Sequence, residues 1–287
     1  MINIIIYYLF KLFSLVNILI PRKLSVFLGK IFGLLMYYTS NKSRDIAQTN
    51  IKIAFPFLSE DKAKKLLINT FKHSGIITNE FFRQKRINLK NISVNIDDET
   101  KKILSDKSGL ILMAAHFGNW EIFLPIINLR RKISAIVREQ KNEGGDKFIS
   151  ERRKFKNVSL ISNKSNLNKM LKPLLNNEIL LILNDQKPKK SGTNLKFFDK
   201  SAVFPKGSGH FYLQTKSRIG FGFCILKQDL SYEFRIKLLS INSKISSKND
   251  MIDEINLKYA KLLEDEIIKY PEQYCWFYKK WDKSLYR

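Results

Sequence analysis

Residues 109–121, GLILMAAHFGNWE, pass from an apolar run into a cluster of polar side chains. An apolar run of this length after a glycine is typical of a strand that is buried on both faces of a sheet. Gly118 permits a tight turn, and Asn119 is a good N-cap for a helix that begins at Trp120. We therefore expect His116 at the carboxyl end of a strand, the edge at which open α/β sheets bind ligands.

His116 and Glu121 form the candidate catalytic pair. From the first turn of the expected helix, Glu121 could reach one nitrogen of the imidazole. A carboxylate at that nitrogen fixes the tautomer and makes the other nitrogen more basic, so the pair could deprotonate a hydroxyl group. A His-x4-Glu spacing alone also fits a histidine that bonds a backbone carbonyl and a solvated glutamate. The small residues Ala114 and Ala115, which leave room before the histidine, favour the catalytic interpretation.

The chain divides into a helical part and a part in which strands and helices alternate, which indicates an α/β fold. Expected helices in the first part cover residues 24–38, 41–54 and 59–86. Strands are expected at residues 92–96, 110–115, 133–137, 158–161, 179–184, 219–226 and 232–239, and helices between them at 120–129, 146–155, 166–176, 207–216 and 249–270. We predict a membrane anchor helix at residues 1–20, a helical membrane-proximal region at 21–90 and an α/β domain at 91–287.

Residues 1–20 are apolar and aromatic apart from Lys11 and a few small polar residues. Their length is about that of a helix that spans the hydrocarbon core of a bilayer. The segment has neither a basic start nor a small-residue cleavage site, which argues against a signal peptide. Lys11 leaves open a helix that lies in the membrane interface. Arg22 and Lys23 follow the segment, and this basic cluster favours a cytoplasmic location for the remainder.

The composition indicates polyanionic partners, because the net charge is +25 with 44% hydrophobic residues. Nucleic acid, an anionic membrane surface and acidic proteins all fit such a charge, although a general abundance of lysine explains part of it. The sequence has no nucleic-acid-binding motif, so we expect no nucleic acid as partner. Its two cysteines and three histidines are too dispersed for a metal site, and no dinucleotide or phosphate loop is present, so no metal or cofactor is expected.

Other polar residues also follow expected strands or close helices. Arg138 follows the strand at 133–137, where its planar fork could bind a phosphate or a thioester carbonyl. Asp185 and Gln186 likewise follow the strand at 179–184. Arg152 and Arg153 end a helix, so they are either binding residues or solvated cations that favour a helix C-terminus.

Residues 115–121 resemble the His-x4-Asp/Glu block of the late acyltransferases of lipid A biosynthesis, the lauroyl/myristoyl transferase family. Other blocks match in the same order: residues 138–153 resemble the family's Arg-x3-Asn block with its trailing arginines, residues 184–186 its Asp-Gln strand end, and residues 271–276 its Pro-Glu-Gln-Tyr-x-Trp segment. Asp199 stands where the family usually has a glycine after two phenylalanines, which puts the local turn in question. The blocks are specific jointly, and they cover nearly the whole chain.

The resemblance implies a mixed central sheet flanked by helices, like that of glycerolphosphate acyltransferases. It implies an O-acyltransferase that moves a fatty acyl chain from acyl carrier protein, or from acyl-CoA, to a hydroxyl group of a phosphorylated lipid A precursor in lipopolysaccharide biosynthesis. The enzyme would lie at the inner membrane with its catalytic domain on the cytoplasmic side. His116 would be the general base and Glu121 its partner; the substrate-binding residues would be Arg138, Asn119, Asp185, Gln186, Arg152 and Arg153. Asp185 and Gln186 would border the active cleft and support the site by hydrogen bonding, without transferring a proton themselves.

Two alternatives remain open. The same pair could acylate a lysophospholipid or another glycolipid. The chain could instead be a membrane-anchored, non-catalytic protein that binds polyanions. Release of free thiol from a thioester donor separates the enzyme from the binding protein.

Overall fold

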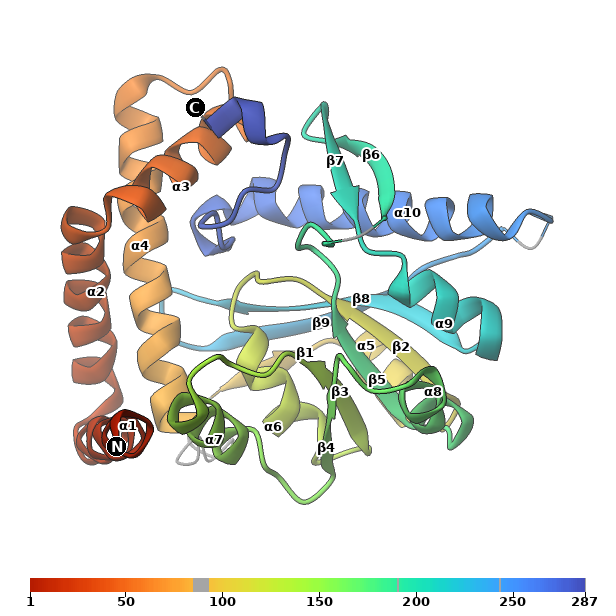
Figure 1. Cartoon of the computed structure of the whole chain (residues 1–287), viewed down its shortest axis with the longest axis horizontal. Helices are drawn as coiled ribbons and strands as arrows, with labels where there is room; N and C mark the ends of the chain where they lie inside the picture. The colour runs from red at the N-terminus through yellow and green to blue at the C-terminus, as the bar shows by residue number, and fades with distance from the viewer. Residues whose placement is uncertain (85–92, 190, 243, 287) are drawn as a thin grey trace.

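The computed structural model describes residues 1–84, 93–189, 191–242 and 244–286. Within these residues a seven-stranded sheet crosses the molecule in the order β1-β9-β8-β2-β5-β3-β4 (Figure 1). Its strands are β1 (Val94–Ile96), β2 (Leu110–Ala114), β3 (Ile133–Val137), β4 (Val158–Ser162), β5 (Ile179–Leu183), β8 (Arg218–Leu226) and β9 (Tyr232–Leu238). The strands lie close to the predicted ranges, although residue 92 falls outside the described residues.

The sheet is mixed, as predicted. β8 and β9 are antiparallel, whereas β2 pairs in parallel with both β8 and β5, and β3 pairs in parallel with β5 and β4. The neighbours β2, β5 and β3 therefore end at one edge of the sheet. The residues that follow these strands include His116, Asp185 and Arg138, so the fold itself brings the predicted strand-end residues to a common edge.

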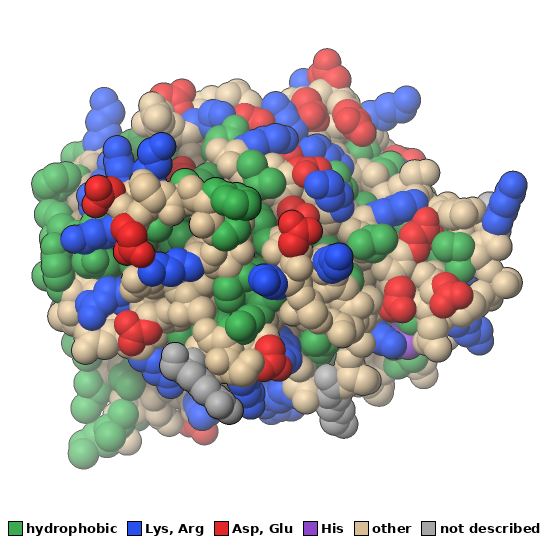
Figure 2. All heavy atoms as spheres, turned by 90° about the horizontal axis from the view of Figure 1, so that it is seen from above, with side chains coloured by type: hydrophobic (Ala, Val, Ile, Leu, Met, Phe, Trp, Pro, Cys, Tyr) green, Lys and Arg blue, Asp and Glu red, His purple; other side chains and the backbone are tan. Residues whose placement is uncertain are grey.

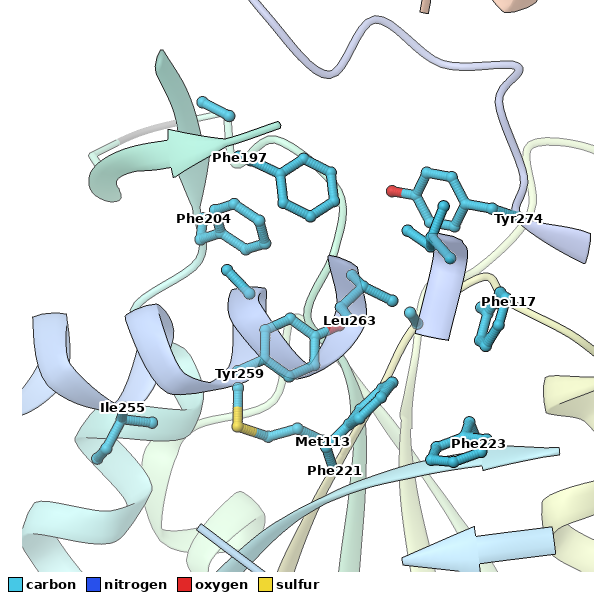
Figure 3. Packing of buried hydrophobic residues seen from close by; sticks show 14 of the residues in the cluster. Met113, Phe117, Phe197, Phe204, Phe221, Phe223, Ile255, Tyr259, Leu263 and Tyr274 are labelled. Carbon is cyan, nitrogen blue, oxygen red and sulfur yellow. The ribbon is translucent and has the colours of Figure 1, made fainter. Parts of the chain in front are cut away.

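The apolar run at residues 110–114 is buried on both faces, as its composition predicts. Ile111 and Met113 belong to one hydrophobic cluster, and Leu110, Leu112 and Ala114 to the other. Figure 3 shows part of the first cluster, in which Phe221 of the sheet and Tyr259 of the long C-terminal helix lie beside Met113. Tyr274, from the last segment of the chain, belongs to the same cluster but lies farther from Met113.

Helices cover both faces of the sheet. α8 (Leu167–Leu175), α9 (Gly207–Thr215) and α10 (Lys248–Lys269) supply residues to the first cluster, whereas α5 (Asp98–Ser105) and α6 (Phe123–Ile127) supply the second. α10 runs above the sheet and α6 below it in Figure 1. The core of the α/β part is therefore two apolar layers with the sheet between them.

The helices α1 (Ile2–Leu19), α2 (Arg22–Thr39), α3 (Asn41–Ala54) and α4 (Glu60–Arg83) stand beside the sheet (Figure 1). α2 packs closely against α4 because glycines face each other: a Cβ atom at Gly75 would lie 2.0 Å from the carbonyl oxygen of Gly29. α4 was predicted to extend to residue 86, and the domain boundary at residues 90 and 91 was predicted nearby. Residue 86 and this boundary lie outside the described residues.

Three local predictions need correction. The helix expected at 120–129 is a short 3₁₀ turn, Trp120–Ile122, followed by the five-residue α6. α5 and a hairpin of β6 (Thr193–Phe197) and β7 (Lys200–Phe204) were not predicted. The hairpin turn places Phe198 and Asp199 at φ values of 49° and 56°. Aspartate tolerates this left-handed conformation, so the turn forms without the family's glycine.

Candidate active site

The turn that carries His116 is fixed by two distant segments. Gly118 has φ +60°, and a Cβ atom there would lie 2.0 Å from the carbonyl oxygen of Cys224 in β8. The Asn119 amide donates to that same carbonyl at 2.7 Å. The C-terminal segment also bonds to this turn. The Gly118 amide donates to the Gln273 carbonyl at 2.9 Å, and the Cys275 amide donates to the His116 carbonyl at 2.8 Å. The motif at residues 271–276 thus positions the turn that carries His116.

His116 binds Asp185 through two contacts. Its Nδ1 lies 2.9 Å from Asp185 Oδ1, and its backbone amide donates to Oδ2 at 3.1 Å. A carboxylate only accepts hydrogen bonds, so Nδ1 carries the proton and Nε2 is the basic nitrogen. The predicted hydrogen bond from Glu121 to the imidazole is therefore wrong for this structure: the partner carboxylate is Asp185, at the end of the neighbouring parallel strand.

Charge attraction shifts the pKa values of both partners. Burial lowers the pKa of His116, but the charge of Asp185 and the hydrogen bond to it outweigh burial, so the pKa lies above its ordinary value. Burial raises the pKa of Asp185, but the charge of His116, its hydrogen bond and that of Tyr278 hold the pKa below its ordinary value. Asp185 is fully buried and stays ionised, which is the state that orients and stabilises an imidazolium.

Two residues from the last segment of the chain support Asp185. The hydroxyl group of Tyr278 donates to Asp185 Oδ2 at 2.7 Å, and Lys280 Nζ donates to the Asp185 carbonyl oxygen at 2.6 Å. Lys280 is buried, and burial lowers its pKa to about 7. Sequence reasoning missed both residues. The available signal was their position directly after the motif at 271–276.

Glu121 pairs with Arg153 instead of His116. Arg153 Nε lies 2.9 Å from Glu121 Oε2, and its Nη2 contacts the other carboxylate oxygen, a two-point geometry that suits a guanidinium fork. Burial lowers the pKa of Arg153, but the charge of Glu121 outweighs it and raises the pKa. Glu121 and Arg153 line the same cavity as the imidazole. The charge of Glu121 therefore raises the pKa of His116, and the charge of Arg153 lowers it.

Asn119 is buried and its side chain is bound inside the protein, so its predicted role in substrate binding needs correction. Its side-chain amide does not cap the following turn but donates to the Tyr232 hydroxyl at 2.8 Å. Tyr232 donates in turn to Glu80 Oε2 at 2.8 Å, and Arg22 forms an ion pair with Glu80. These contacts connect Arg22, the first residue of α2, to the turn that carries His116. Glu80 belongs to this network and does not contact His116 directly.

A cleft of about 780 Å³ opens at the carboxyl edge of β2, β3 and β5. His116, Trp120 and Glu121 lie at one side of it, and leucine, isoleucine, valine and alanine side chains line its floor. Five basic side chains also line it: Arg138, Lys141, Arg153, Lys164 and Lys189. The carboxylate of Glu139 lies in the same lining and pairs with Lys164. Gln186 also lies in the cleft, with its Nε2 3.4 Å from His116 Nε2. Arg152 does not line this cleft.

Comparison with known proteins shows that the chain is an acyltransferase. It belongs to the family of bacterial lipid A biosynthesis acyltransferases, whose model matches residues 1–283. This confirms the family predicted from the sequence blocks.

The chain is similar to the lipid A biosynthesis palmitoleoyltransferase of Escherichia coli (strain K12) and to a lipid A biosynthesis acyltransferase of Shigella flexneri. Each is 20% identical to it over 280 residues, which are 93% of this chain and 90% of the relative. Among solved structures, the 1-acyl-sn-glycerophosphate (LPA) acyltransferase PlsC of Thermotoga maritima is 11% identical, with a TM-score of 0.38; the match covers 85% of this chain and 98% of that chain.

Proposed function

We propose that the protein transfers a fatty acyl chain from the thioester of acyl carrier protein to a hydroxyl group of a lipid A precursor in lipopolysaccharide biosynthesis. The observation that carries this proposal is the orientation of His116. Its Nδ1 bonds the buried Asp185, and the ring lines the cleft with Nε2 near Gln186. An imidazole held in this way is ready to accept a proton from an acceptor hydroxyl.

In the proposed reaction, Nε2 removes the hydroxyl proton while the acceptor oxygen attacks the thioester carbonyl carbon. The carbonyl π electrons move to oxygen and give a tetrahedral oxyanion. Its collapse forms the ester, breaks the carbon–sulfur bond and releases a thiolate, which takes the proton back from His116. Asp185 stabilises the imidazolium between the two proton transfers. The overall change is one thioester and one alcohol to one ester and one thiol.

Glu121 acts indirectly in this proposal. Its carboxylate holds the Arg153 guanidinium at the wall of the cleft, where a cation can stabilise the developing oxyanion. Glu121 also adds negative charge near His116 and thereby raises the pKa of the imidazole. We assign Glu121 and Arg153 to one electrostatic unit, and His116 and Asp185 to the proton transfer.

The rim of the cleft suits negatively charged substrates. Arg138, Lys141 and Lys189 line it and are exposed, and no carboxylate pairs with them in the described residues. Arg138 at the rim is placed to bind a phosphate group of the acceptor. The remaining cations, within a chain of net charge +25, favour an acidic carrier protein as the acyl donor. Acyl-CoA is also anionic, so a direct comparison of donors is needed.

The first two helices suit a membrane surface. Figure 2 shows hydrophobic side chains along the edge of the molecule that α1 and α2 form. α1 is long and apolar enough to cross a membrane by length and composition. However, Asn3 donates to Glu143 at 3.0 Å, Tyr7 donates to Glu151 at 2.8 Å, and Lys11 pairs with Glu151. A helix that is bound along one side to α7 (Glu143–Arg152) fits the interface of the inner membrane, with the α/β part on the cytoplasmic side.

The proposal is tested with purified full-length protein in detergent. Matched acyl chains are supplied on acyl carrier protein or on coenzyme A, with a lipid A precursor or a lysophospholipid as acceptor, and His116→Ala as the control. We expect free thiol release and a precursor heavier by one acyl group, with a higher kcat/KM for the carrier protein. Acylation of the lysophospholipid alone would contradict the proposed acceptor, and absence of any thiol release would contradict acyl transfer.

A further inference from the structure

A second hollow, separate from the catalytic cleft, runs along α1. It has a volume of about 750 Å³, and its wall consists mainly of α1 side chains, among them Ile4, Tyr8, Leu12 and Leu15. Arg152, the last residue of α7, also lines it. No residue lines both this hollow and the cleft that contains His116. Arg152 and Arg153 are neighbours in sequence, but they serve different sites.

Arg152 is buried and forms no ion pair with the described residues, although the charge of Glu151 attracts it without direct contact. Its residue is 6% exposed, and its Nε and Nη1 atoms have no hydrogen-bond partner in the described residues. The guanidinium carbon lies 4.9 Å from the centre of the Phe148 ring, one turn earlier in α7. The adjacent carboxylate of Glu151 is already bound by Tyr7 and Lys11. Burial of a cation with unpaired donors costs free energy, so the arrangement favours a bound anion.

We propose that Arg152 binds the phosphate group of an anionic phospholipid of the membrane, whose acyl chains lie along α1. A guanidinium with free donors is suited to phosphate oxygens. The wall of the hollow is apolar, and Ile4, Tyr8, Leu12 and Leu15 are more than two-fifths exposed. The acyl chains of a phospholipid can contact such a wall, whereas a soluble phosphate ion would leave it uncovered. The inference does not depend on the proposed acyl transfer.

The position of α1 makes this lipid part of the contact between α1 and the α/β part. Gly144 lets α1 approach α7 closely, because a Cβ atom there would lie 1.8 Å from the carbonyl oxygen of Asn3. Lys11 lines the same hollow, where it pairs with Glu151, so Lys11, Glu151 and Arg152 together keep one net positive charge. A phosphate bound by Arg152 beside this ion pair would hold α1 on α7 at the membrane surface.

The test compares thermal unfolding of the full-length protein in an uncharged detergent with dihexanoylphosphatidylglycerol or with dihexanoylphosphatidylcholine. We expect the anionic lipid, at about ten times its dissociation constant, to raise the unfolding midpoint of the unmodified protein by about 3 °C. Arg152→Met should abolish this rise. It should also unfold at the same or a higher temperature without lipid, because the unpaired buried charge is gone. Lys156→Gln, which removes an exposed positive charge nearby, should respond like the unmodified protein.

Several outcomes would overturn the proposal. An equal response of Arg152→Met and the unmodified protein would show that the lipid binds elsewhere. An equal response to both lipids would exclude recognition of the phosphodiester charge. If only a phosphorylated lipid A precursor gave an Arg152-dependent rise, Arg152 would belong to the acceptor site. Should Arg152→Met fail to fold, Arg152→Lys replaces it; this variant keeps the charge but loses the planar fork, and we expect weaker binding by about tenfold.

Discussion

His116 Nδ1 lies 2.9 Å from Asp185 Oδ1, although the two residues are 69 positions apart in the sequence. They meet because β2 and β5 are adjacent and parallel, so the residues that follow the two strands lie side by side. Asp185 binds both the imidazole and the backbone amide of His116. The contact therefore fixes the rotation of the ring as well as its tautomer.

We expect Asp185→Asn to lower turnover by about 10²–10⁴-fold, the range of general acid–base contributions, with a small change in KM. Asparagine keeps the shape and one acceptor but removes the charge that stabilises the imidazolium. His116→Ala should lose at least as much, and the double variant should lose little more, because the two residues act as a unit. Steady-state kinetics of folded variants measures this; full additivity of the two losses would argue against a shared role.

Activity should fall as the pH decreases, because protonated His116 cannot accept a proton. The pKa of His116 is raised, so the acid limb of kcat/KM should have its midpoint above the ordinary value of a histidine. Above that midpoint the imidazole is neutral and the rate should reach a plateau. A rate that stays constant from pH 8 down to pH 5 would exclude His116 as the base.

Glu121 and Arg153 should behave as a coupled pair. Each single substitution, Glu121→Gln or Arg153→Gln, leaves a buried charge unpaired and should reduce activity. The double variant removes both charges, so its loss should be smaller than the sum, with a coupling energy of about 1 kcal/mol or more. A double-mutant cycle on kcat/KM measures this energy. A value near zero would mean that Glu121 and Arg153 act independently and would contradict their assignment to one electrostatic unit.

The strand ends were readable from the sequence, but their pairing was not. An apolar run with a following histidine predicts β2 and places His116 at the sheet edge. The order of strands is a tertiary property: β5 inserts between β2 and β3, and this brings Asp185 to His116. Glu121 was the expected partner because it is close in sequence. A 3₁₀ turn in place of the expected helix carries Glu121, and its carboxylate bonds Arg153.

The residues that support Asp185 could not be predicted from the sequence for a related reason. Tyr278 and Lys280 come from the last segment of the chain, 93 and 95 positions from Asp185, and no local pattern indicates such a contact. The docking of α1 on α7 joins residues about 140 positions apart. An apolar helix pattern predicts membrane contact, but it does not distinguish a spanning helix from one that is bound along its side.

An interfacial α1 should keep its amino end on the cytoplasmic side. In a variant with Ile2→Cys, an impermeant thiol reagent should label the new cysteine in inverted inner-membrane vesicles but not from outside in spheroplasts. Lys156→Cys, in the α/β part, provides the cytoplasmic control. Ile2 is exposed in the structure, whereas Cys224 is buried and Cys275 is partly buried. Labelling of the unmodified protein, which reports any reaction of Cys275, is subtracted. Labelling from outside would show that α1 spans the membrane.

The pKa of His116 in Asp185→Asn and Glu121→Gln tests the central assignment most directly. It can be measured by nitrogen NMR of labelled histidine, with the signal assigned through His116→Ala. We expect Asp185→Asn to lower the pKa of His116, because the adjacent opposite charge is lost, and Glu121→Gln to lower it less. A larger decrease in Glu121→Gln than in Asp185→Asn would contradict the assignment of Asp185 as the partner of His116.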